Sequence, residues 1–186
     1  DSFSDGGLWD GAPDRAVAHG LALAAAGADI LDIGGESTRP GAAEVPAEEE
    51  MRRVVPVIAA LAARTPLPLS VDTCKAAVAA AAVAAGACII NDVTALGGDP
   101  GMRRVAADCR AGVVLMHMRG TPRTMNGLAH YDDVVGEVCD ALRAAVAAAR
   151  AAGIAADAIT VDPGFGFAKE PPHNAALLRG LARVAG

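Results

Sequence analysis

The stretch ADILDIGGESTRPG (28–41) begins as an apolar run and ends on a group of polar residues and glycines. A buried parallel strand reads as such a short hydrophobic run rather than as an alternating one. Ligands of α/β proteins bind at the carboxyl ends of parallel strands. The same pattern returns in LPLSVDT (67–73), ACIINDVT (87–94), GVVLMHM (112–118) and AITVDPGFGF (158–167). These polar strand ends together predict a single ring of functional groups.

Helical patterns fill the intervals between the expected strands, which we place at 28–33, 67–71, 87–91, 112–117 and 158–161. This alternation predicts an α/β fold with a parallel sheet, either doubly wound or a (β/α)8 TIM barrel. A doubly wound sheet gathers its ligand at one switch point, whereas functional groups at every strand end favour the barrel. No GxGxxG follows the first strand. The helices are expected at 13–26, 46–63, 74–85, 99–110, 131–152 and 173–185.

The number of strands falls short of a closed barrel, which needs eight strands and about 250 residues. We expect residues 1–186 to form one partial TIM-barrel domain with about five strands and their helices. On this interpretation the chain is an internal piece of a longer protein. One strand would precede residue 1 and two would follow residue 186, so the piece by itself is expected to be inactive.

Composition narrows the class of protein. The chain has 16 Lys and Arg against 22 Asp and Glu, a formal charge of −6, which argues against a general nucleic-acid surface. The spacing of the four cysteines does not suggest a metal or redox motif, so we interpret them as free thiols in a reducing compartment, the cytoplasm. No apolar run reaches the roughly 18 residues of a membrane span without a charge or a breaker.

Six motifs give the chain a specific resemblance: DSFSDGG (1–7), DIGGESTRPGA (32–42), VDT with the following Lys75 (71–75), INDV (90–93), MHMRGTPRTM (116–125) and DPGFGFAK (162–169). They resemble the successive signatures of the dihydropteroate synthase family, in the family's order and at similar spacing. The resemblance implies a TIM-barrel transferase of folate biosynthesis. Such an enzyme joins 6-hydroxymethyl-7,8-dihydropterin pyrophosphate to p-aminobenzoate, giving 7,8-dihydropteroate and pyrophosphate.

The strand-end residues suit a pterin. Its edge carries N–H donors beside acceptor nitrogens and a carbonyl, which carboxylates and an amide can pair in a dry pocket. Asp72, Asn91 and Asp162 supply that set, and the resemblance adds Met116 against the pterin face. Each has a plainer alternative: Asp72 as a helix N-cap, Asn91 as a turn residue, Asp162 as an Asx-turn and Met116 as core. By resemblance, Asp72 also stabilises the positive charge that develops when pyrophosphate leaves.

The second substrate is assigned by resemblance to two loops that close over the site and to the glycine-rich turn after the last strand. A slot lined by Phe and Pro suits a flat aryl ring, and glycine allows the backbone to approach it. Arg39, also a catalytic candidate, can engage a carboxylate or pyrophosphate, with a plain surface arginine as its alternative. The residues implied for this pocket are Phe3, Asp5, Thr38, Arg39, Pro40, Gly166 and Phe167.

Some groups are given other roles. Asp5 pairs with Arg39 or approaches Mg²⁺, and the sequence does not separate these two roles. His117 lies between two methionines and is expected to be structural, while Lys169 is interpreted as a surface cation near the barrel mouth. The resemblance implies Mg²⁺ as a cofactor, but the family's metal-binding Asn would lie before residue 1, so no metal ligand is expected in this chain. The family's late Lys and Arg-x-His would lie beyond residue 186. The resemblance also implies a homodimer.

Two other functions stay open from the sequence. A methyltetrahydrofolate methyltransferase domain also binds a pterin in a TIM barrel, although the ESTRPG loop and the DSFSDGG opening fit it less well. A non-catalytic pterin-binding homologue could keep these loops while its late Lys, Arg or His is replaced.

Overall fold

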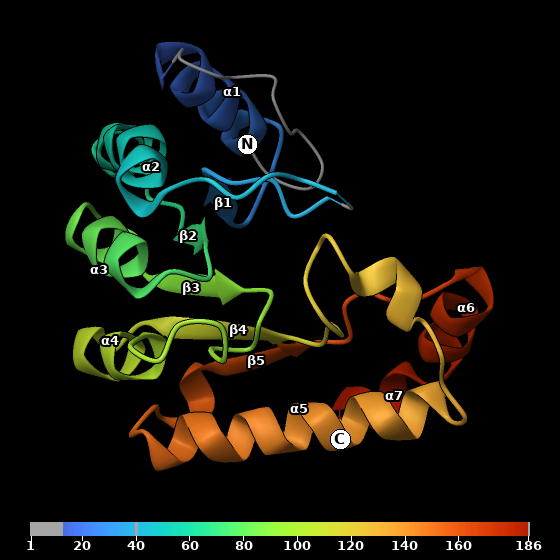
Figure 1. Ribbon diagram of the computed structural model, residues 1–186. Coiled ribbons are helices and arrows are strands. Elements are labelled where there is room, and N and C mark those ends of the chain that lie inside the picture. Colours follow the sequence, from blue (N-terminus) through green and yellow to red (C-terminus); the bar gives the residue numbers. More distant parts are fainter. Residues whose placement is uncertain (1–12, 40, 186) are drawn as a thin grey trace.

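The computed structural model describes residues 13–39 and 41–185, and within them one parallel sheet positions the candidate site. Its strands follow one another in sequence order (Figure 1). A doubly wound sheet would reverse this order at its switch point, whereas a barrel adds each strand beside the last. The α/β class and five successive units of the TIM barrel are therefore confirmed. The strands are β1 Leu31–Gly34, β2 Leu69–Asp72, β3 Ile89–Asp92, β4 Gly112–Met116 and β5 Ile159–Asp162.

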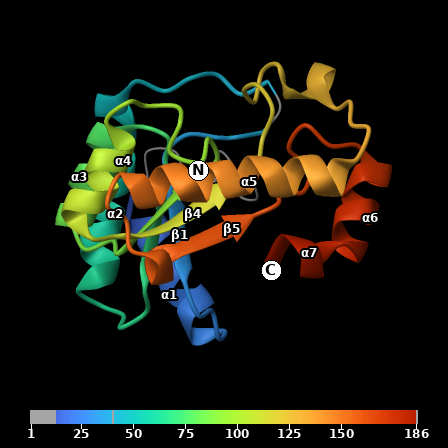
Figure 2. The same ribbon diagram turned by 90° about the horizontal axis from the view of Figure 1, so that it is seen from below.

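Helices cover one side of this sheet, with α2, α3 and α4 stacked along it and α5 crossing below β5 (Figures 1 and 2). The expected helix at 173–185 is two helices that part at Gly180. A Cβ on Gly180 would lie 2.9 Å from Val135 Cγ1, so the glycine lets this turn approach α5 closely. The helices are α1 Pro13–Ala25, α2 Ala47–Ala62, α3 Ala76–Ala84, α4 Met102–Cys109, α5 Val134–Ala151, α6 Pro171–Arg179 and α7 Leu181–Ala185, with short 3-10 helices at Met125–Leu128 and Ala156–Ala158.

The strand register separates an apolar face from a polar one. Val71 pairs with Ile90, which pairs with Val113, and these aliphatic side chains are buried in the main core. Successive residues of a strand point to opposite faces. Asp72 and its partner Asn91 therefore point to the face away from the helices.

The apolar face accounts for the stability of the arrangement. Val71 and Ile90 are 0% exposed and pack with Ile58 and Leu61 of α2 and Val78 of α3. Burial of each such side chain contributes about 1.5–3 kcal/mol relative to leaving it in water. The helices thus fix the strands from behind, and the polar face is held still without contributing to the core.

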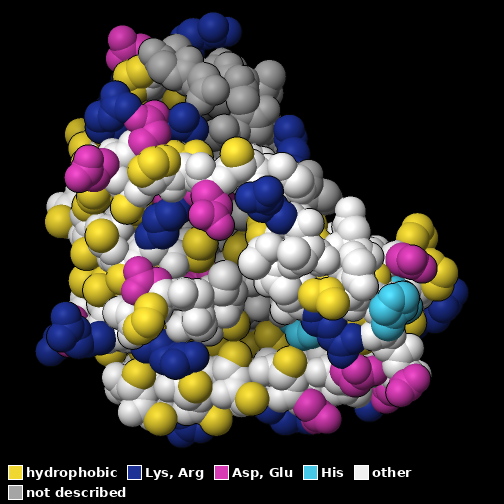
Figure 3. All heavy atoms as spheres, viewed as in Figure 1, with side chains coloured by type: hydrophobic (Ala, Val, Ile, Leu, Met, Phe, Trp, Pro, Cys, Tyr) yellow, Lys and Arg dark blue, Asp and Glu magenta, His cyan; other side chains and the backbone are white. Residues whose placement is uncertain are grey.

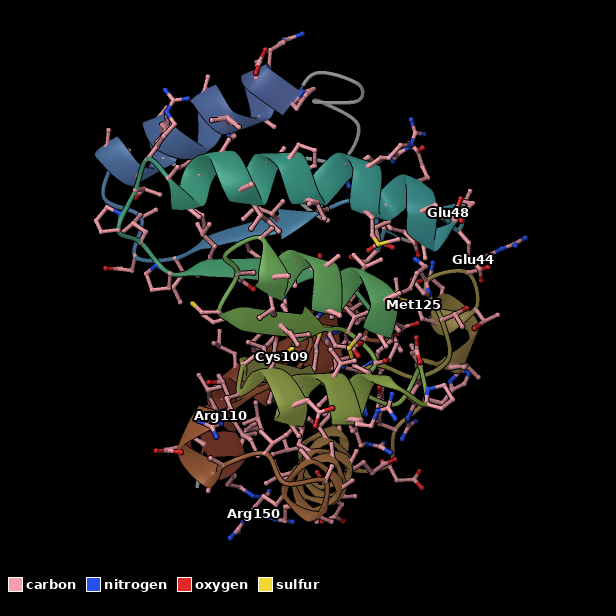
Figure 4. All side chains as sticks on the ribbon, turned by 90° about the vertical axis from the view of Figure 1, so that its left-hand side faces the viewer. Glu44, Glu48, Cys109, Arg110, Met125 and Arg150 are labelled. Carbon is pink, nitrogen blue, oxygen red and sulfur yellow. The ribbon has the colours of Figure 1, made fainter. Side chains whose placement is uncertain are left out.

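The two ends of the sheet differ in what they carry. Glu44 and Met125 lie at the end to which the strands run, whereas Cys109 and Arg110 lie at the opposite end (Figure 4). On the face seen in Figure 3, apolar side chains are scattered among charged ones. All four cysteines are free, as expected. In the described part of the chain, no helix is both long and apolar enough to cross a membrane.

Candidate functional site

Asp72 and Asn91 lie side by side at the carboxyl ends of β2 and β3, where the register pairs them. The Asn91 amide donates a hydrogen bond of 3.0 Å to Oδ2 of Asp32 on β1. Asn91 is thus a strand residue, and its alternative role as a turn residue is wrong. Asp32 was not singled out from the sequence, although it ends the same apolar run that carries the first loop. Three adjacent strands therefore bring two carboxyl groups and one amide to the same face.

The Asp72 carboxyl is buried and surrounded by other acids. Its pKa is raised to about 8, first by burial and then by the charges of Asp32, Asp92 and Glu50. The side chain therefore holds a proton at neutral pH. A ligand that presents N–H groups or positive charge would stabilise the carboxylate and lower this pKa. Such a strongly shifted group at a strand end is typical of a functional site.

Asp92 and Asp99 accept hydrogen bonds from backbone N–H groups. Asp92 is fully buried and accepts hydrogen bonds from the Thr94 backbone (2.7 Å) and the Leu96 backbone (3.1 Å). It thereby holds a loop in which Leu96 has a φ of +60°. Asp99 Oδ2 accepts the Ala76 N–H of the first turn of α3 at 2.9 Å. The alternative prediction, that Asp72 is the N-cap of this helix, is therefore wrong.

Asp162 and Met116 pair with each other across β5 and β4. Asp162 Oδ1 accepts the Gly164 N–H at 2.7 Å. One carboxyl oxygen of Asp162 therefore forms the Asx-turn that was the alternative prediction for this residue. Met116 is buried in a small apolar cluster that also contains Met125 and Phe167. This cluster lies directly beside the carboxyl ends of the strands, separate from the main core.

The loop after β1 is fixed at its base by a network of partly buried charges. Lys75 Nζ lies 2.6 Å from Oε2 of Glu36 and 2.5 Å from Oε2 of Glu50. The same Glu36 oxygen accepts the Val45 N–H at 2.8 Å, which joins the two ends of the loop. Glu50 is fully buried in α2, so the network ties the loop to the helix layer. The sequence showed these residues without indicating that they meet.

Farther along this loop lie two of the residues expected at the second-substrate pocket. Thr38 is buried and Arg39 half-buried. The Gly41 N–H donates to the Pro122 carbonyl at 3.1 Å, so the loop also contacts the segment that follows β4. Between the two segments lies a cavity of about 540 Å³ that Thr38 helps to line. Phe3, Asp5 and Pro40 lie outside the described residues.

The turn after β5 carries Gly166 and Phe167, and its neighbours have unexpected roles. Gly166 is exposed, and its N–H donates to Oδ1 of Asn174 at 3.0 Å. Lys169 is only 7% exposed, so its prediction as a surface cation is wrong. It lies 2.9 Å from Nδ1 of His117, which is likewise buried, in agreement with a structural role for that histidine. The sequence around Lys169 does not indicate that the lysine is buried, because the groups that enclose it come together only when the turn folds.

Divalent metal ions need several oxygen or nitrogen ligands in one place. Among the described residues, no group of three or more His, Cys, Asp or Glu side chains is arranged to hold a metal ion. Two acids near Asp72 already accept hydrogen bonds within the protein: Asp92 from the turn that follows it, and Asp32 from the Asn91 amide. These residues therefore do not fit a magnesium site by themselves.

Comparison with known proteins gives a consistent result. A family model described as pterin binding enzyme matches residues 1–185. Dihydropteroate synthase from Escherichia coli (strain K12) is 48% identical over 182 residues, which are 98% of this chain and 64% of that protein. The chain thus spans slightly less than two thirds of the length of this curated relative.

Solved structures agree with the sequence match. Dihydropteroate synthase from Xanthomonas albilineans with 4-aminobenzoic acid is 53% identical with a TM-score of 0.89, covering 98% of this chain and 65% of that one. The Yersinia pestis dihydropteroate synthase in a sulfonamide drug complex is 47% identical with a TM-score of 0.94, covering 99% and 66%. Both similarities extend over almost every described residue of the sheet and its helices.

Proposed function

Because the chain belongs to the pterin-binding enzyme family, we propose that the protein is a dihydropteroate synthase. It would join 6-hydroxymethyl-7,8-dihydropterin pyrophosphate to p-aminobenzoate and release pyrophosphate. The relatives that bear this name, one of them with 4-aminobenzoic acid bound, support the proposal. The observation that carries it within this chain is the set of Asp72, Asn91 and Asp162 at the carboxyl ends of β2, β3 and β5 of one sheet.

These three residues suit recognition of the pterin ring. The carboxyl groups accept hydrogen bonds from its amino group and ring N–H, while the Asn91 amide both donates and accepts. Each of these groups costs free energy if it is buried without a partner, which favours a ligand with the matching pattern. Met116 lies in the apolar cluster beside Asp162 and can pack against the ring face.

The reaction is a substitution at the pterin methylene carbon. The carbon–oxygen bond to pyrophosphate breaks, the amine nitrogen forms the new bond, and the amine then loses a proton to solvent. Positive charge develops on the methylene and ring while pyrophosphate leaves. The Asp72 carboxylate, which lies on the polar face of the sheet, stabilises this charge. Arg39 is proposed to engage the carboxylate of the second substrate or the leaving pyrophosphate.

The second substrate is proposed to lie between the loop after β1 and the turn after β5. Thr38 and Arg39 come from the first, and Gly166 and Phe167 from the second. Phe3, Asp5 and Pro40 complete this assignment as expectations from the sequence. A sulfonamide, which resembles p-aminobenzoate in shape and charge, is proposed to compete at this place; a relative in a sulfonamide complex supports this.

Other parts of the proposal concern the whole protein. We propose that residues 1–186 form one partial barrel domain, that the protein acts in the cytoplasm, and that it forms a homodimer. We still expect Mg²⁺ to bind together with the pyrophosphate group. Since the described residues do not fit a metal site, no step above depends on it.

The test is p-aminobenzoate-dependent release of pyrophosphate from the dihydropterin substrate by the complete natural protein, with and without Mg²⁺. Release that a sulfonamide inhibits supports a synthase. Pterin binding without release, with every substrate present, would instead indicate a non-catalytic pterin-binding protein.

A further inference from the structure

The side chain of Lys169 ends in a buried cage of acceptors. Its Nζ lies 3.0 Å from the carbonyl oxygen of Gly164, 2.9 Å from that of Phe167 and 3.1 Å from that of His117. The fourth neighbour is Nδ1 of His117 at 2.9 Å. An ammonium group donates hydrogen bonds and accepts none. Its three protons are therefore shared among four acceptors, and the neutral His117 ring, which faces the ammonium with Nδ1, carries its proton on Nε2.

The charges of this pair are compatible with that arrangement. Burial, with Lys169 and Arg119 nearby, lowers the pKa of His117 to about 4, so the ring stays neutral at physiological pH. Burial also lowers the pKa of Lys169 to about 8, while the charge of Asp162 opposes the fall. At neutral pH the lysine is therefore mostly charged, and it can donate all three of its protons within the cage.

The segment that Lys169 holds is the turn 164–168, which belongs to no strand or helix. Gly164 and Gly166 have φ values of +68° and +81°, and Ala168, which has a Cβ, has a φ of +50°. A residue other than glycine in this region is strained by about 1 kcal/mol or more. The turn needs side-chain partners to keep this shape.

Those partners surround it. The Gly166 N–H donates to Asn174, the Ala168 carbonyl accepts the Tyr131 hydroxyl at 3.0 Å, and Lys169 closes the interior. Lys169 binds two carbonyls of the turn at once, so it links the two ends of the turn. Its bond to the His117 carbonyl joins the turn to the end of β4.

The backbone of the pterin candidates next to the turn is held in a different way, although the Asp162 carboxyl also accepts the Gly164 N–H of the turn. Met116 and Asp162 pair within the β4–β5 ladder, and the His117 N–H continues that ladder to the Asp162 carbonyl at 2.9 Å. Loss of the lysine amine would leave these backbone bonds in place. It would remove bonds chiefly from the turn that carries Gly166 and Phe167.

We propose that Lys169 is a positioning residue for the second substrate, because its contacts set the turn that presents Gly166 and Phe167 to p-aminobenzoate. This inference rests on the proposed synthase function. It assigns Lys169 no contact with either substrate, and it separates the two substrates by degree: binding of the aryl amine depends on the lysine more strongly than binding of the pterin does.

The experiment compares Lys169→Met with the wild-type complete protein and with Arg150→Met, a matched change of an exposed cation in α5. Methionine keeps the length of the side chain without its donors. We expect KM for p-aminobenzoate to rise by about tenfold or more while the Kd for the dihydropterin substrate changes by less than about threefold. Arg150→Met should change neither value.

A general loss of folded protein would lower kcat and leave KM unchanged, so the split between the two substrates distinguishes positioning from stability. Asn174→Ala, which removes the acceptor of the Gly166 N–H, is a second variant with a half-buried side chain. It should shift the same KM, and it decides the question if Lys169→Met does not fold. An unchanged KM for p-aminobenzoate, or equal losses for both substrates, overturns the inference while wild-type turnover upholds the synthase. No turnover by the wild type overturns both.

Discussion

Asp72 is the residue on which most of the proposed chemistry depends. It lies at the end of β2 opposite Asn91, and burial, followed by the charges of three other acids, raises the pKa of its carboxyl to about 8. The surroundings thus disfavour the charged form until a ligand compensates it. Pterin N–H groups and the positive charge of the transition state both provide that compensation, so the site becomes charged in step with its substrate.

The first prediction concerns the rate. Asp72→Asn keeps the shape of the side chain but removes its negative charge, so kcat should fall by about 100-fold or more. Steady-state kinetics of the complete protein measure the effect, with Arg150→Ala as a surface control that should retain its activity. A comparable loss in both variants would remove Asp72 from its assigned role.

The second prediction concerns stability and pH. In the unfolded chain the pKa of the Asp72 carboxyl is near its ordinary value of 3.8, whereas in the folded protein it is about 8. Between these values the native protein binds more protons than the unfolded chain. Its free energy of unfolding should therefore fall as the pH rises, by up to about 1.4 kcal/mol per unit from this group. Urea unfolding of ligand-free wild type and Asp72→Asn should show a shallower fall in the variant; parallel curves would contradict the raised pKa.

Single residues differ in how well the sequence revealed them. Asp72, Asn91 and Asp162 follow apolar runs, and a polar group at a strand end is visible in the sequence. Lys169 was misplaced, because its carbonyl partners belong to a turn whose shape local pattern does not specify. Asp32 was overlooked because its pairing with Asn91 depends on the strand register.

At the scale of elements, α3 shows how loops and helices are joined. Its N-cap Lys75 makes no capping bond from its side chain. Asp99, which precedes α4, instead accepts the Ala76 N–H at 2.9 Å and its own neighbour Gly101 N–H at 2.8 Å. These two bonds lower the pKa of Asp99, since they favour its charged form. One carboxylate thus links the start of α3 to the loop before α4.

The third prediction tests this link. Asp99→Ala should lower the free energy of unfolding by about 1 kcal/mol, the usual cost of losing a cap. The dihydropterin substrate should bind no differently, because Asp99 acts on a helix end and not on the ring of strand-end groups. Chemical denaturation gives the first quantity and substrate titration the second; a selective loss of pterin affinity would contradict this division.

Elements as units were well predicted, and their boundaries were not. The order of strands and helices follows from the hydrophobic pattern of the sequence, because each element needs apolar residues on the face that it buries. The helix expected from residue 74 begins at Ala76, because the cap that starts it comes from Asp99, distant in sequence. The division between α6 and α7 similarly depends on the Val135 side chain packing at Gly180.

At the scale of the molecule, the helix layer supports a polar face that carries the site. Residues of β1, β2, β3 and β5 contribute to that face, so a ligand there contacts several units of the fold at once. Such a ligand binds the native state and not the unfolded chain, and its binding free energy adds to global stability.

The fourth prediction follows. The dihydropterin substrate at 100 times its Kd should stabilise the complete protein by about 2.7 kcal/mol and raise Tm by roughly 5 °C. Thermal unfolding followed by circular dichroism measures the shift. Asp72→Asn should lose most of it, while Arg150→Ala should keep it; an equal shift in Asp72→Asn would place the pterin elsewhere.

The sequence by itself determined the α/β class, the order of the strands and helices, and the polar groups at the strand ends. The reason is that strands and helices which bury one face have apolar residues at local, periodic positions. Tertiary structure alone decided which polar groups meet. The Lys75 network with Glu36 and Glu50, the Asn91 bond to Asp32 and the enclosure of Lys169 all join segments that only the folded chain brings together. Hydrogen bonds and charges act over a few ångströms, so their partners are fixed by register and loop shape rather than by composition.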